Sequence, residues 1–428
     1  MADFVTVIGG GLAGCEAALY LAAHGIKVKL YEAKPLWRSA AHKSNDLAEI
    51  VCSNSLKSTV TTTASGALKA ELDIMGCRLL EIARNNAVPA GSALAVDRDG
   101  FSRDVTSAVY SEPNITVVHE VAERIPENGI TIVCAGPVCH DALAGALGEL
   151  TGQSSLHFFD AAAPIVTAEC IDYSRAFFGA RYGKGDADYL NCPMTKDEYL
   201  AFHSALVTAE RVIDEVGGVF EGCMPVEVMA ARGVDALRFG PLRPVGFRDA
   251  GKPYAVLQLR RENTESTLYN LVGFQTNLKF GEQKRVFSMI PALKNIEIVR
   301  YGVMHRNTFI NAPQCLTKSL CLENRNGVYV AGQLCGVEGY VESIATGLLA
   351  AINVAHALRG EAAVPPPETT VLGALVRYIT SPSKDFQPMN ANFGILPPLD
   401  GVKKAERKQA YYDRCVASCK EWAADYLT

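Results

Sequence analysis

Residues 4–32 read FVTVIGGGLAGCEAALYLAAHGIKVKLYE and contain the strongest signal for the fold. A β-rich run enters a glycine-rich turn, a helix rich in Ala and Leu follows, Gly25 ends that helix, and a second β-rich run closes on Glu32. This order predicts a strand, a helix and a second strand parallel to the first. The chain therefore opens with a βαβ unit of an α/β fold.

The glycine-rich turn has the GxGxxG spacing that a dinucleotide pyrophosphate requires. Gly9 allows the tight turn, Gly11 lets the backbone approach the phosphates, and Gly14 lets the helix pack on the strand. Free N–H groups at the start of the helix favour the phosphate charge. Glu32 is placed to accept hydrogen bonds from an adenosine ribose. The expected contacts of this unit are Gly9, Gly10, Gly11, Leu12, Ala13, Gly14 and Glu32.

A second glycine-rich segment lies near the other end of the chain. The first unit alone would suit FAD, NAD(P) or S-adenosylmethionine. Residues 327–358, GVYVAGQLCGVEGYVESIATGLLAAINVAHAL, predict another strand, glycine turn and long helix. Two such segments favour a flavoprotein of the FAD/NAD-linked reductase type. In such proteins a helix near the C-terminus of the chain points its own N-terminus at the flavin ring. The expected contacts of this segment are Gly332, Gln333, Glu342 and Ser343.

Residues 130–137, ITIVCAGP, predict one more buried strand. In flavoproteins of this type such a strand passes beneath FAD, which would bring Gly136 to the cofactor. A parallel strand without ligand contact fits the pattern equally well.

These signals define the expected architecture. We predict an α/β fold, with a Rossmann-like FAD-binding domain of the glutathione-reductase type and an inserted α+β domain. The FAD-binding domain is expected at residues 1–160 and 311–428, the second part ending in an amphipathic helix. The insertion is expected at 161–310, with alternating strands and a helix from Lys196 to Glu215.

Positive charge is concentrated in the insertion. Residues 232–306 carry 13 Lys and Arg against 6 Asp and Glu, whereas the whole chain has a formal charge of −5. A solvated surface usually mixes its signs, so this bias indicates an anionic partner such as RNA. The same range contains aromatic rings that could stack on unpaired bases or pack in a core: Phe239, Phe247, Tyr254, Tyr269, Phe274, Phe280 and Tyr301.

Composition places the chain among soluble globular proteins. It has 428 residues, with 49% hydrophobic and 20% charged residues. Its 13 cysteines include no CxxC pair and no zinc-type spacing, which favours reduced thiols in the cytoplasm and no metal site. We expect neither a signal peptide nor a membrane span.

Six phrases along the chain carry a more specific signal. They are EIVCSNSLKS (49–58), FEGCMPVEVMAARG (220–233), YNLVGFQTNLKFGEQKRVF (269–287), RYGVMHRNTFIN (300–311), VAGQLCGVEGYVES (330–343) and FQPMNANFGILPP (386–398). With them the chain resembles the folate- and FAD-dependent tRNA (uracil-5-)-methyltransferases, the TrmFO family, which is related to the MnmG/GidA flavoproteins.

The resemblance implies methylation of uracil C5 in RNA. The T-loop uridine of tRNA is the expected target, and a 23S rRNA uridine is the alternative. The carbon would come from 5,10-methylenetetrahydrofolate, the electrons from NADH or NADPH through FAD, and tetrahydrofolate would be released. No obligate protein partner is implied.

Uracil C5 becomes nucleophilic only after a group adds to C6, and a thiolate is suited to that addition. The resemblance selects two cysteines: Cys223 to attack C6, and Cys52 to face the flavin and take the C5 proton. The two roles could be exchanged. His305 is expected at the flavin face, and the expected contacts to RNA phosphate or folate carboxylates are Lys279, Lys284, Arg285, Arg300 and Arg306.

Two other classes of function remain open at this level. The chain could be a non-methylating, flavin-binding RNA-binding protein, although the presence of both Cys52 and Cys223 argues against it. It could instead be a small-molecule flavin oxidoreductase, which would have no use for the basic range. Transfer of labelled carbon from folate to RNA separates these classes.

Overall fold

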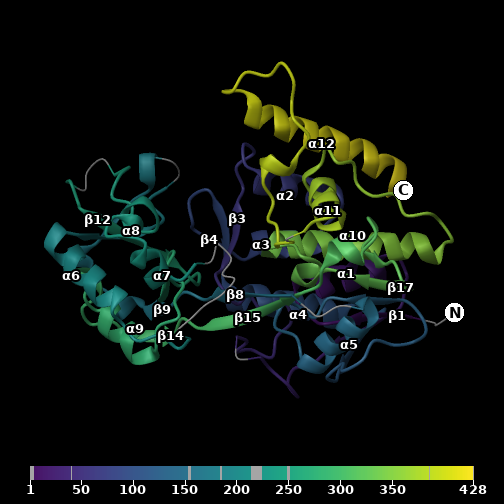
Figure 1. Cartoon of the computed structure of the whole chain (residues 1–428), viewed down its shortest axis with the longest axis horizontal. Coiled ribbons are helices and arrows are strands. Elements are labelled where there is room, and N and C mark those ends of the chain that lie inside the picture. The colour runs from purple at the N-terminus through teal and green to yellow at the C-terminus, as the bar shows by residue number, and fades with distance from the viewer. Residues whose placement is uncertain are drawn as a thin grey trace.

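The structure is a computed structural model of the chain. It describes residues 4–39, 41–152, 156–183, 186–213, 224–247, 251–384 and 386–427. The helices and strands gather into two lobes (Figure 1). The first lobe has one hydrophobic core drawn from residues 5–147 and 309–426, and the second lobe has its own core from residues 166–296.

The first lobe is built around a six-stranded sheet with the order β16-β17-β7-β1-β2-β6. Its strands β6, β2, β1, β7 and β17 run parallel, and β16 pairs antiparallel with β17 at one edge. The bounds are β1 (Val5–Ile8), β2 (Val28–Glu32), β6 (Ile115–His119), β7 (Thr131–Val133), β16 (Cys321–Leu322) and β17 (Arg325–Val330). The predicted βαβ unit is confirmed: β1 and β2 are parallel neighbours joined by α1 (Leu12–Ala23).

Helix α1 packs directly on α10 (Tyr340–Leu358). A Cβ added at Gly347 of α10 would lie 2.3 Å from the carbonyl oxygen of Ala13, so glycine permits the close approach of the two helices. By length and composition alone, α10 is long and apolar enough to cross a membrane. Because 89% of its most apolar window is buried inside the protein, α10 is the core helix of the first lobe.

The other helices of the first lobe surround this core. Their bounds are α2 (Ala64–Ile74), α3 (Arg78–Asn85), α4 (Arg98–Ser111), α5 (Asp141–Thr151), α11 (Val371–Thr380) and α12 (Arg407–Tyr426). A small antiparallel sheet adds β3 (Ser55–Ser58), β4 (Ala87–Val88) and β5 (Ala93–Val96). The predicted amphipathic helix at the C-terminus is confirmed, since α12 buries Cys415, Cys419, Trp422 and Tyr426.

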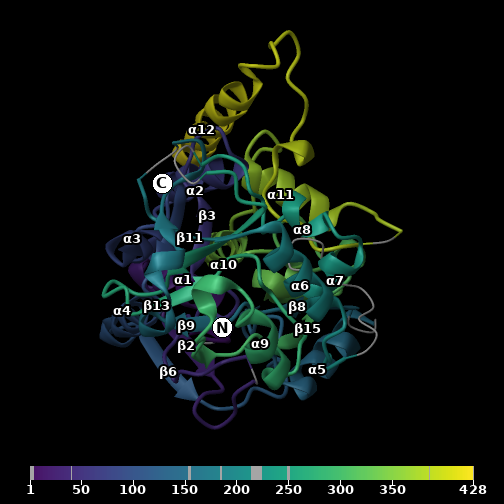
Figure 2. The ribbon, with the colours of Figure 1, turned by 90° about the vertical axis from the view of Figure 1, so that its left-hand side faces the viewer.

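The second lobe is an antiparallel sheet with helices around it, and this lobe faces the viewer in Figure 2. The strand order is β10-β11-β12-β13-β9-β14. The bounds are β9 (Ile165–Thr167), β10 (Phe177–Phe178), β11 (Leu190–Met194), β12 (Ala255–Arg261), β13 (Leu268–Leu271), β14 (Ile298–Arg300), α6 (Lys196–Val207), α7 (Val226–Ala231), α8 (Ala236–Phe239) and α9 (Phe280–Phe287). The predicted α/β class with an α+β addition is therefore confirmed.

The predicted helix from Lys196 to Glu215 is too long. Helix α6 ends at Val207, and the following backbone pairs with another segment: the N–H of Val212 donates to the carbonyl of Asn277 at 2.8 Å. Glu215 itself lies outside the described residues. Competition from this long-range pairing ends the helix where the local pattern would have continued it.

A two-stranded antiparallel ribbon joins the lobes. It consists of β8 (Leu156–Ala161) and β15 (Met304–Phe309), which lie between the lobes in Figure 1. The predicted boundaries at 160 and 310 fall at the ends of these strands. In the register of the ribbon, Asp160 stands directly opposite His305. The ribbon thus brings two titratable side chains from distant parts of the sequence to one place.

Candidate active site

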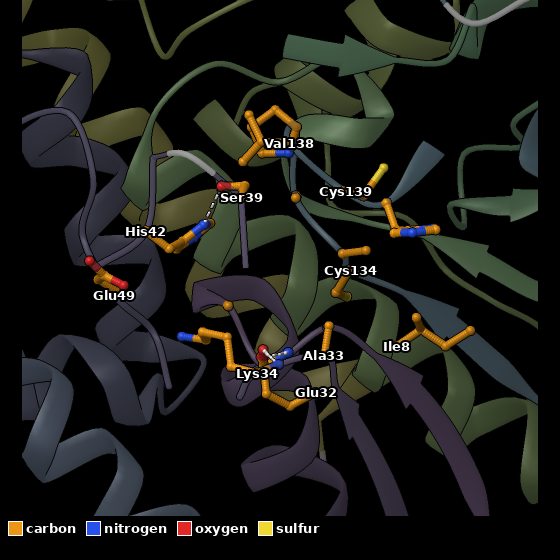
Figure 3. A pocket seen from close by; sticks show the side chains of 18 of the residues that line it. Ile8, Glu32, Ala33, Lys34, Ser39, His42, Glu49, Cys134, Val138 and Cys139 are labelled. Carbon is orange, nitrogen blue, oxygen red and sulfur yellow. Dashed lines mark hydrogen bonds between the residues drawn. The ribbon is translucent and has the colours of Figure 1, made fainter. Parts of the chain in front are cut away.

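A cavity lies at the carboxyl ends of β1, β2 and β7, where folds of this class bind nucleotides (Figure 3). Its walls come from the turn after β1, the segments after β2 and β7, the loop at 49–52, the β8–β15 ribbon and the start of α10. The cavity therefore runs from the glycine-rich turn to the ribbon that joins the lobes.

The glycine-rich turn has the geometry that the sequence predicts. Gly9 has φ +103°, and a Cβ there would lie 2.5 Å from Cα of Ala135. A Cβ at Gly14 would lie 1.9 Å from the carbonyl oxygen of Gly9. At Gly11, by contrast, an added Cβ would meet no atom within 4 Å. Gly9 and Gly14 are thus required by the protein's own packing, whereas the space beside Gly11 is left open for a ligand.

Gly14→Ala and Gly11→Ala form a matched pair of variants. We expect Gly14→Ala to lower the free energy of unfolding by about 1–3 kcal/mol, because the added methyl has no room. Gly11→Ala should keep the stability of the fold but weaken FAD binding roughly tenfold, because its methyl fills the open space. Urea denaturation and FAD titration measure the two effects. Equal losses of stability in both variants would contradict this division of roles.

Glu32 organises the turn while it faces the cavity (Figure 3). One carboxylate oxygen accepts the N–H of Gly10 at 3.0 Å, and the other accepts the N–H of Lys34 at 2.9 Å. Each oxygen keeps a lone pair, so the carboxylate can still accept from the hydroxyls of a ribose.

The cofactor contacts predicted outside the first βαβ unit lie only partly at the same cavity. Gly136, Gly332, Gln333 and Ser343 line it. Glu342 is not among the lining residues; its fully buried carboxylate accepts from Nζ of Lys57 at 2.7 Å and from the N–H of Ala391 at 2.9 Å. The structure therefore gives Glu342 a role in fixing the polypeptide around the start of α10.

Three polar side chains meet at the ribbon end of the cavity. Sγ of Cys52 lies 3.4 Å from Oδ2 of Asp160 and 3.9 Å from Nε2 of His305, and that nitrogen lies 3.8 Å from the same Asp160 oxygen. The backbone N–H of Cys52 donates to the hydroxyl of Tyr340 at 2.7 Å. We refer to Cys52, Asp160 and His305 as the thiol corner.

The loop that carries Cys52 is fixed from behind by a buried arginine. Nη1 of Arg98 donates to the carbonyl of Ile50 and, at 3.0 Å, to that of Val51. The same guanidinium pairs with Glu262 of the second lobe at 3.0 Å. Both lobes therefore hold the position of the cysteine.

The surroundings of Cys52 favour the neutral thiol. Burial raises the pKa of Cys52 well above its usual range, and the charges of Asp160 and Glu338 raise it further. Burial also lowers the pKa of His305, which the charge of Asp160 partly opposes. Nearby cations or a helix N-terminus usually stabilise a catalytic thiolate, whereas carboxylates stand beside the Cys52 thiol.

The three groups of the thiol corner are close to one another. Its sulfur, carboxylate oxygen and imidazole nitrogen all lie within 4.8 Å of one another.

The predicted substrate residues are spread over the structure. His305 lines the cavity, and Arg300 is half-buried in a second cavity between the lobes, where it donates to the carbonyl of Ala41 at 3.1 Å. Arg306 follows His305 on β15, so its side chain points to the opposite face of the ribbon. Cys223 lies outside the described residues.

The three remaining basic candidates lie on or beside α9. Lys279 pairs with Glu210 at 2.7 Å, and Arg285 pairs with Glu282 at 2.6 Å. Lys284 is exposed on the same helix. None of the three lines the cavity described above.

Sequence reasoning did not single out several residues that line the cavity. They are Lys34, Trp37, His42, Cys139, His140, Asp160 and Tyr340. Tyr340 lies within the phrase VAGQLCGVEGYVES, which could have drawn attention to it. Asp160 lies outside every quoted phrase, and its place depends on the pairing of β8 with β15.

Comparisons with known proteins agree with this fold. Residues 4–362 match the model of the family described as glucose inhibited division protein A. The chain is 54% identical over 407 residues to the methylenetetrahydrofolate–tRNA-(uracil-5-)-methyltransferase TrmFO of Moorella thermoacetica, covering 94% of this chain and 93% of the relative. It is 49% identical over 433 residues to the TrmFO of Syntrophomonas wolfei, covering 99% of each.

A solved structure of GidA from Aquifex aeolicus has a similar fold. It superposes with a TM-score of 0.71 at 16% identity and covers 99% of this chain and 73% of its own. At this identity the likeness concerns the fold alone, and it supports the Rossmann-like FAD-binding class.

Proposed function

This chain belongs to the TrmFO family, and from that premise we propose that it is a methylenetetrahydrofolate–tRNA-(uracil-5-)-methyltransferase that methylates C5 of the T-loop uridine. The one-carbon unit comes from 5,10-methylenetetrahydrofolate, and tetrahydrofolate is released. FAD, reduced by NADH or NADPH, supplies the electrons that convert the transferred carbon into a methyl group.

One observation carries the proposal: the glycine-rich turn that would hold a dinucleotide and the thiol corner line the same cavity. Gly11, with its open side, and Cys52 both line it. A dinucleotide bound on the glycine turn would therefore lie in the same cavity as a cysteine. This combination serves redox-assisted carbon transfer to a ring that needs thiol chemistry.

The residues present fit FAD. The pyrophosphate would lie on the open side of Gly11, and Glu32 would accept from the ribose. The full set that would hold the cofactor is Gly9, Gly10, Gly11, Leu12, Ala13, Glu32, Gly136, Gly332, Gln333 and Ser343. Gly14 contributes by packing, and Glu342 by fixing the start of α10.

We assign the two cysteines different roles. Cys223 adds to C6, and Cys52 handles the proton that leaves C5. The protonated state that the surroundings of Cys52 favour supports this order, because a neutral thiol is a poor nucleophile but can exchange a proton. His305, beside Cys52 at the cavity wall, is suited to pack against the folate or the uracil ring.

Carbon tracing tests the function. Purified enzyme with FAD, NADPH and unmodified tRNA transcript should move label from 5,10-[¹⁴C]methylenetetrahydrofolate into 5-methyluridine of the T-loop. Labelled S-adenosylmethionine is the matched control and should give no product. A colourless protein that takes up no FAD, or label that arrives only from S-adenosylmethionine, would overturn the proposal. Labelling of 23S rRNA but not of tRNA would move the target to the alternative RNA.

A further inference from the structure

Asp160 is a buried carboxylate that contacts the Cys52 thiol. The thiol donates to its Oδ2 at 3.4 Å, and its other oxygen accepts the N–H of Ala161 at 2.8 Å. The side chain of Asp160 is 2% exposed. One oxygen is thus held by the backbone of β8, and the other is presented to the sulfur. The carboxylate is fixed as an acceptor for the proton of Cys52.

The thiol is surrounded by titratable and charged groups from several elements. These are Asp160 on β8, His305 on β15, Arg98 at the start of α4, Glu338 in the turn before α10 and Tyr340 at the start of α10. The hydroxyl of Tyr340 is occupied as acceptor for the N–H of Cys52. Burial and the charge of Asp160 raise the pKa of Glu338 above its usual range, and its carboxyl group accepts from Nε2 of Gln333. Asp160 is therefore the carboxylate that the thiol proton can reach directly.

Resting on the proposed function, we propose that Asp160 is a positioning residue that acts through Cys52 when the proton of uracil C5 is removed. The C5–H bond breaks and its electron pair stays on the pyrimidine ring. The proton passes to Sγ of Cys52, while the thiol's own proton passes to Oδ2 of Asp160. The thiol ends unchanged and Asp160 ends protonated, and exchange with water after product release restores the carboxylate.

We call this transfer of protons through Cys52 to Asp160 the relay. The relay and a mechanism in which ionised Cys52 alone removes the proton predict opposite effects of Asp160→Asn. If ionised Cys52 alone took the proton, removal of the neighbouring negative charge would ease ionisation of the thiol. Proton removal would then keep its rate at neutral pH or become faster. In the relay, asparagine cannot accept the proton, so the step becomes slower.

Tritium release measures the step directly. Holoenzyme is mixed with 5,10-methylenetetrahydrofolate, NADPH and tRNA transcript that contains [5-³H]uridine. We expect Asp160→Asn to release tritium about 100-fold more slowly than the wild type at pH 7. The remaining rate should rise with pH, because only the ionised thiol can then take the proton. The covalent adduct with 5-fluorouridine tRNA should still form, since it depends on Cys223.

Two controls separate this role from a structural one. Glu338→Gln replaces a neighbouring carboxyl that accepts from Gln333, whereas the thiol donates to Asp160, so this variant should release tritium within about threefold of the wild type at pH 7. Alkylation of Cys52 by iodoacetamide, read by peptide mass spectrometry, should be at least as fast in Asp160→Asn as in the wild type. This would show that the loop is in place.

Two outcomes would count against the assignment, and a third would count against the proposed function. Tritium release by Asp160→Asn at the wild-type rate or faster overturns the relay. Slower alkylation of Cys52 together with loss of FAD also overturns it, because Asp160 would then be a structural residue only. If the wild type itself gives no folate-dependent tritium release, the proposed function fails instead.

Discussion

Replacement of Cys52 by alanine is expected to lower methyl transfer roughly 10³-fold, because no group remains between uracil C5 and Asp160 to pass the proton. FAD should stay bound, since Cys52 is not one of the residues that would hold the cofactor. The covalent adduct with 5-fluorouridine tRNA should still form through Cys223. Methyl incorporation and a denaturing gel of the trapped adduct measure the two outcomes separately.

Cys170→Ala provides the matched control for this variant. Cys170 is also a half-buried free cysteine, but it belongs to the second lobe and donates to the carbonyl of Thr167 at 3.1 Å. It should keep the wild-type rate. Loss of the trapped adduct in Cys52→Ala, with adduct retained in Cys223→Ala, would exchange the two roles. Full methyl transfer by Cys52→Ala would remove the thiol corner from the reaction.

The parts of this molecule that were predictable from sequence are those set by neighbouring residues. The βαβ unit is complete within residues 4–32, and its turn, helix and strands each leave a local pattern. Gly14 is a glycine for a reason internal to that unit, because an added Cβ would lie 1.9 Å from the carbonyl oxygen of Gly9. Gly9 has a positive φ within the turn, but the close backbone beside it belongs to Ala135, outside the unit. The expected fold class follows from these local patterns.

The thiol corner could not be predicted in the same way. Cys52 and Asp160 are 108 positions apart, and Cys52 and His305 are 253 apart. Their meeting depends on the register of β8 against β15, which no short stretch of sequence encodes. Cys52 and His305 were reached through the family resemblance, whereas Asp160 had neither a local pattern nor a quoted phrase to mark it.

The number of charged residues in a range likewise did not predict which basic side chains lie at the site. The excess of Lys and Arg in residues 232–306 describes composition, and it does not say where each side chain points. Arg285 forms an exposed pair with Glu282 on α9, while Arg300 donates to the backbone carbonyl of Ala41. Similarly, Glu342 lies in the segment 327–358 that was predicted to contact the cofactor, but the rotation of α10 directs its carboxylate to Lys57. Local sequence gives the element, and packing decides its exposed face.

The Arg98–Glu262 pair is expected to have the largest effect on stability. Both side chains are buried, with 9% and 3% exposure, and they join the first lobe to the second. Arg98→Ala would leave the charge of Glu262 buried without this partner and remove the donor to the carbonyls of Ile50 and Val51. We expect the free energy of unfolding to fall by about 3–5 kcal/mol, as measured by urea denaturation.

An exposed ion pair gives the matched comparison. Arg84 and Asp73 are paired at 2.7 Å, with 48% and 43% exposure, so Arg84→Ala should cost only about 0–1 kcal/mol. The double variant Arg98→Met/Glu262→Leu should recover part of the stability lost in Arg98→Ala, because no unpaired charge is left inside the protein. Equal small losses in Arg98→Ala and Arg84→Ala would show that the buried pair does not hold the lobes together.

The same pair links stability to chemistry, because Arg98 holds the two residues that precede Cys52. In the double variant the charge is balanced, but the carbonyls of Ile50 and Val51 have lost their guanidinium donor. We therefore expect it to regain stability without regaining the methyl transfer rate, since the thiol is no longer held against Asp160. Recovery of both together would mean that Arg98 acts on the fold alone and that the cysteine loop holds its position without it.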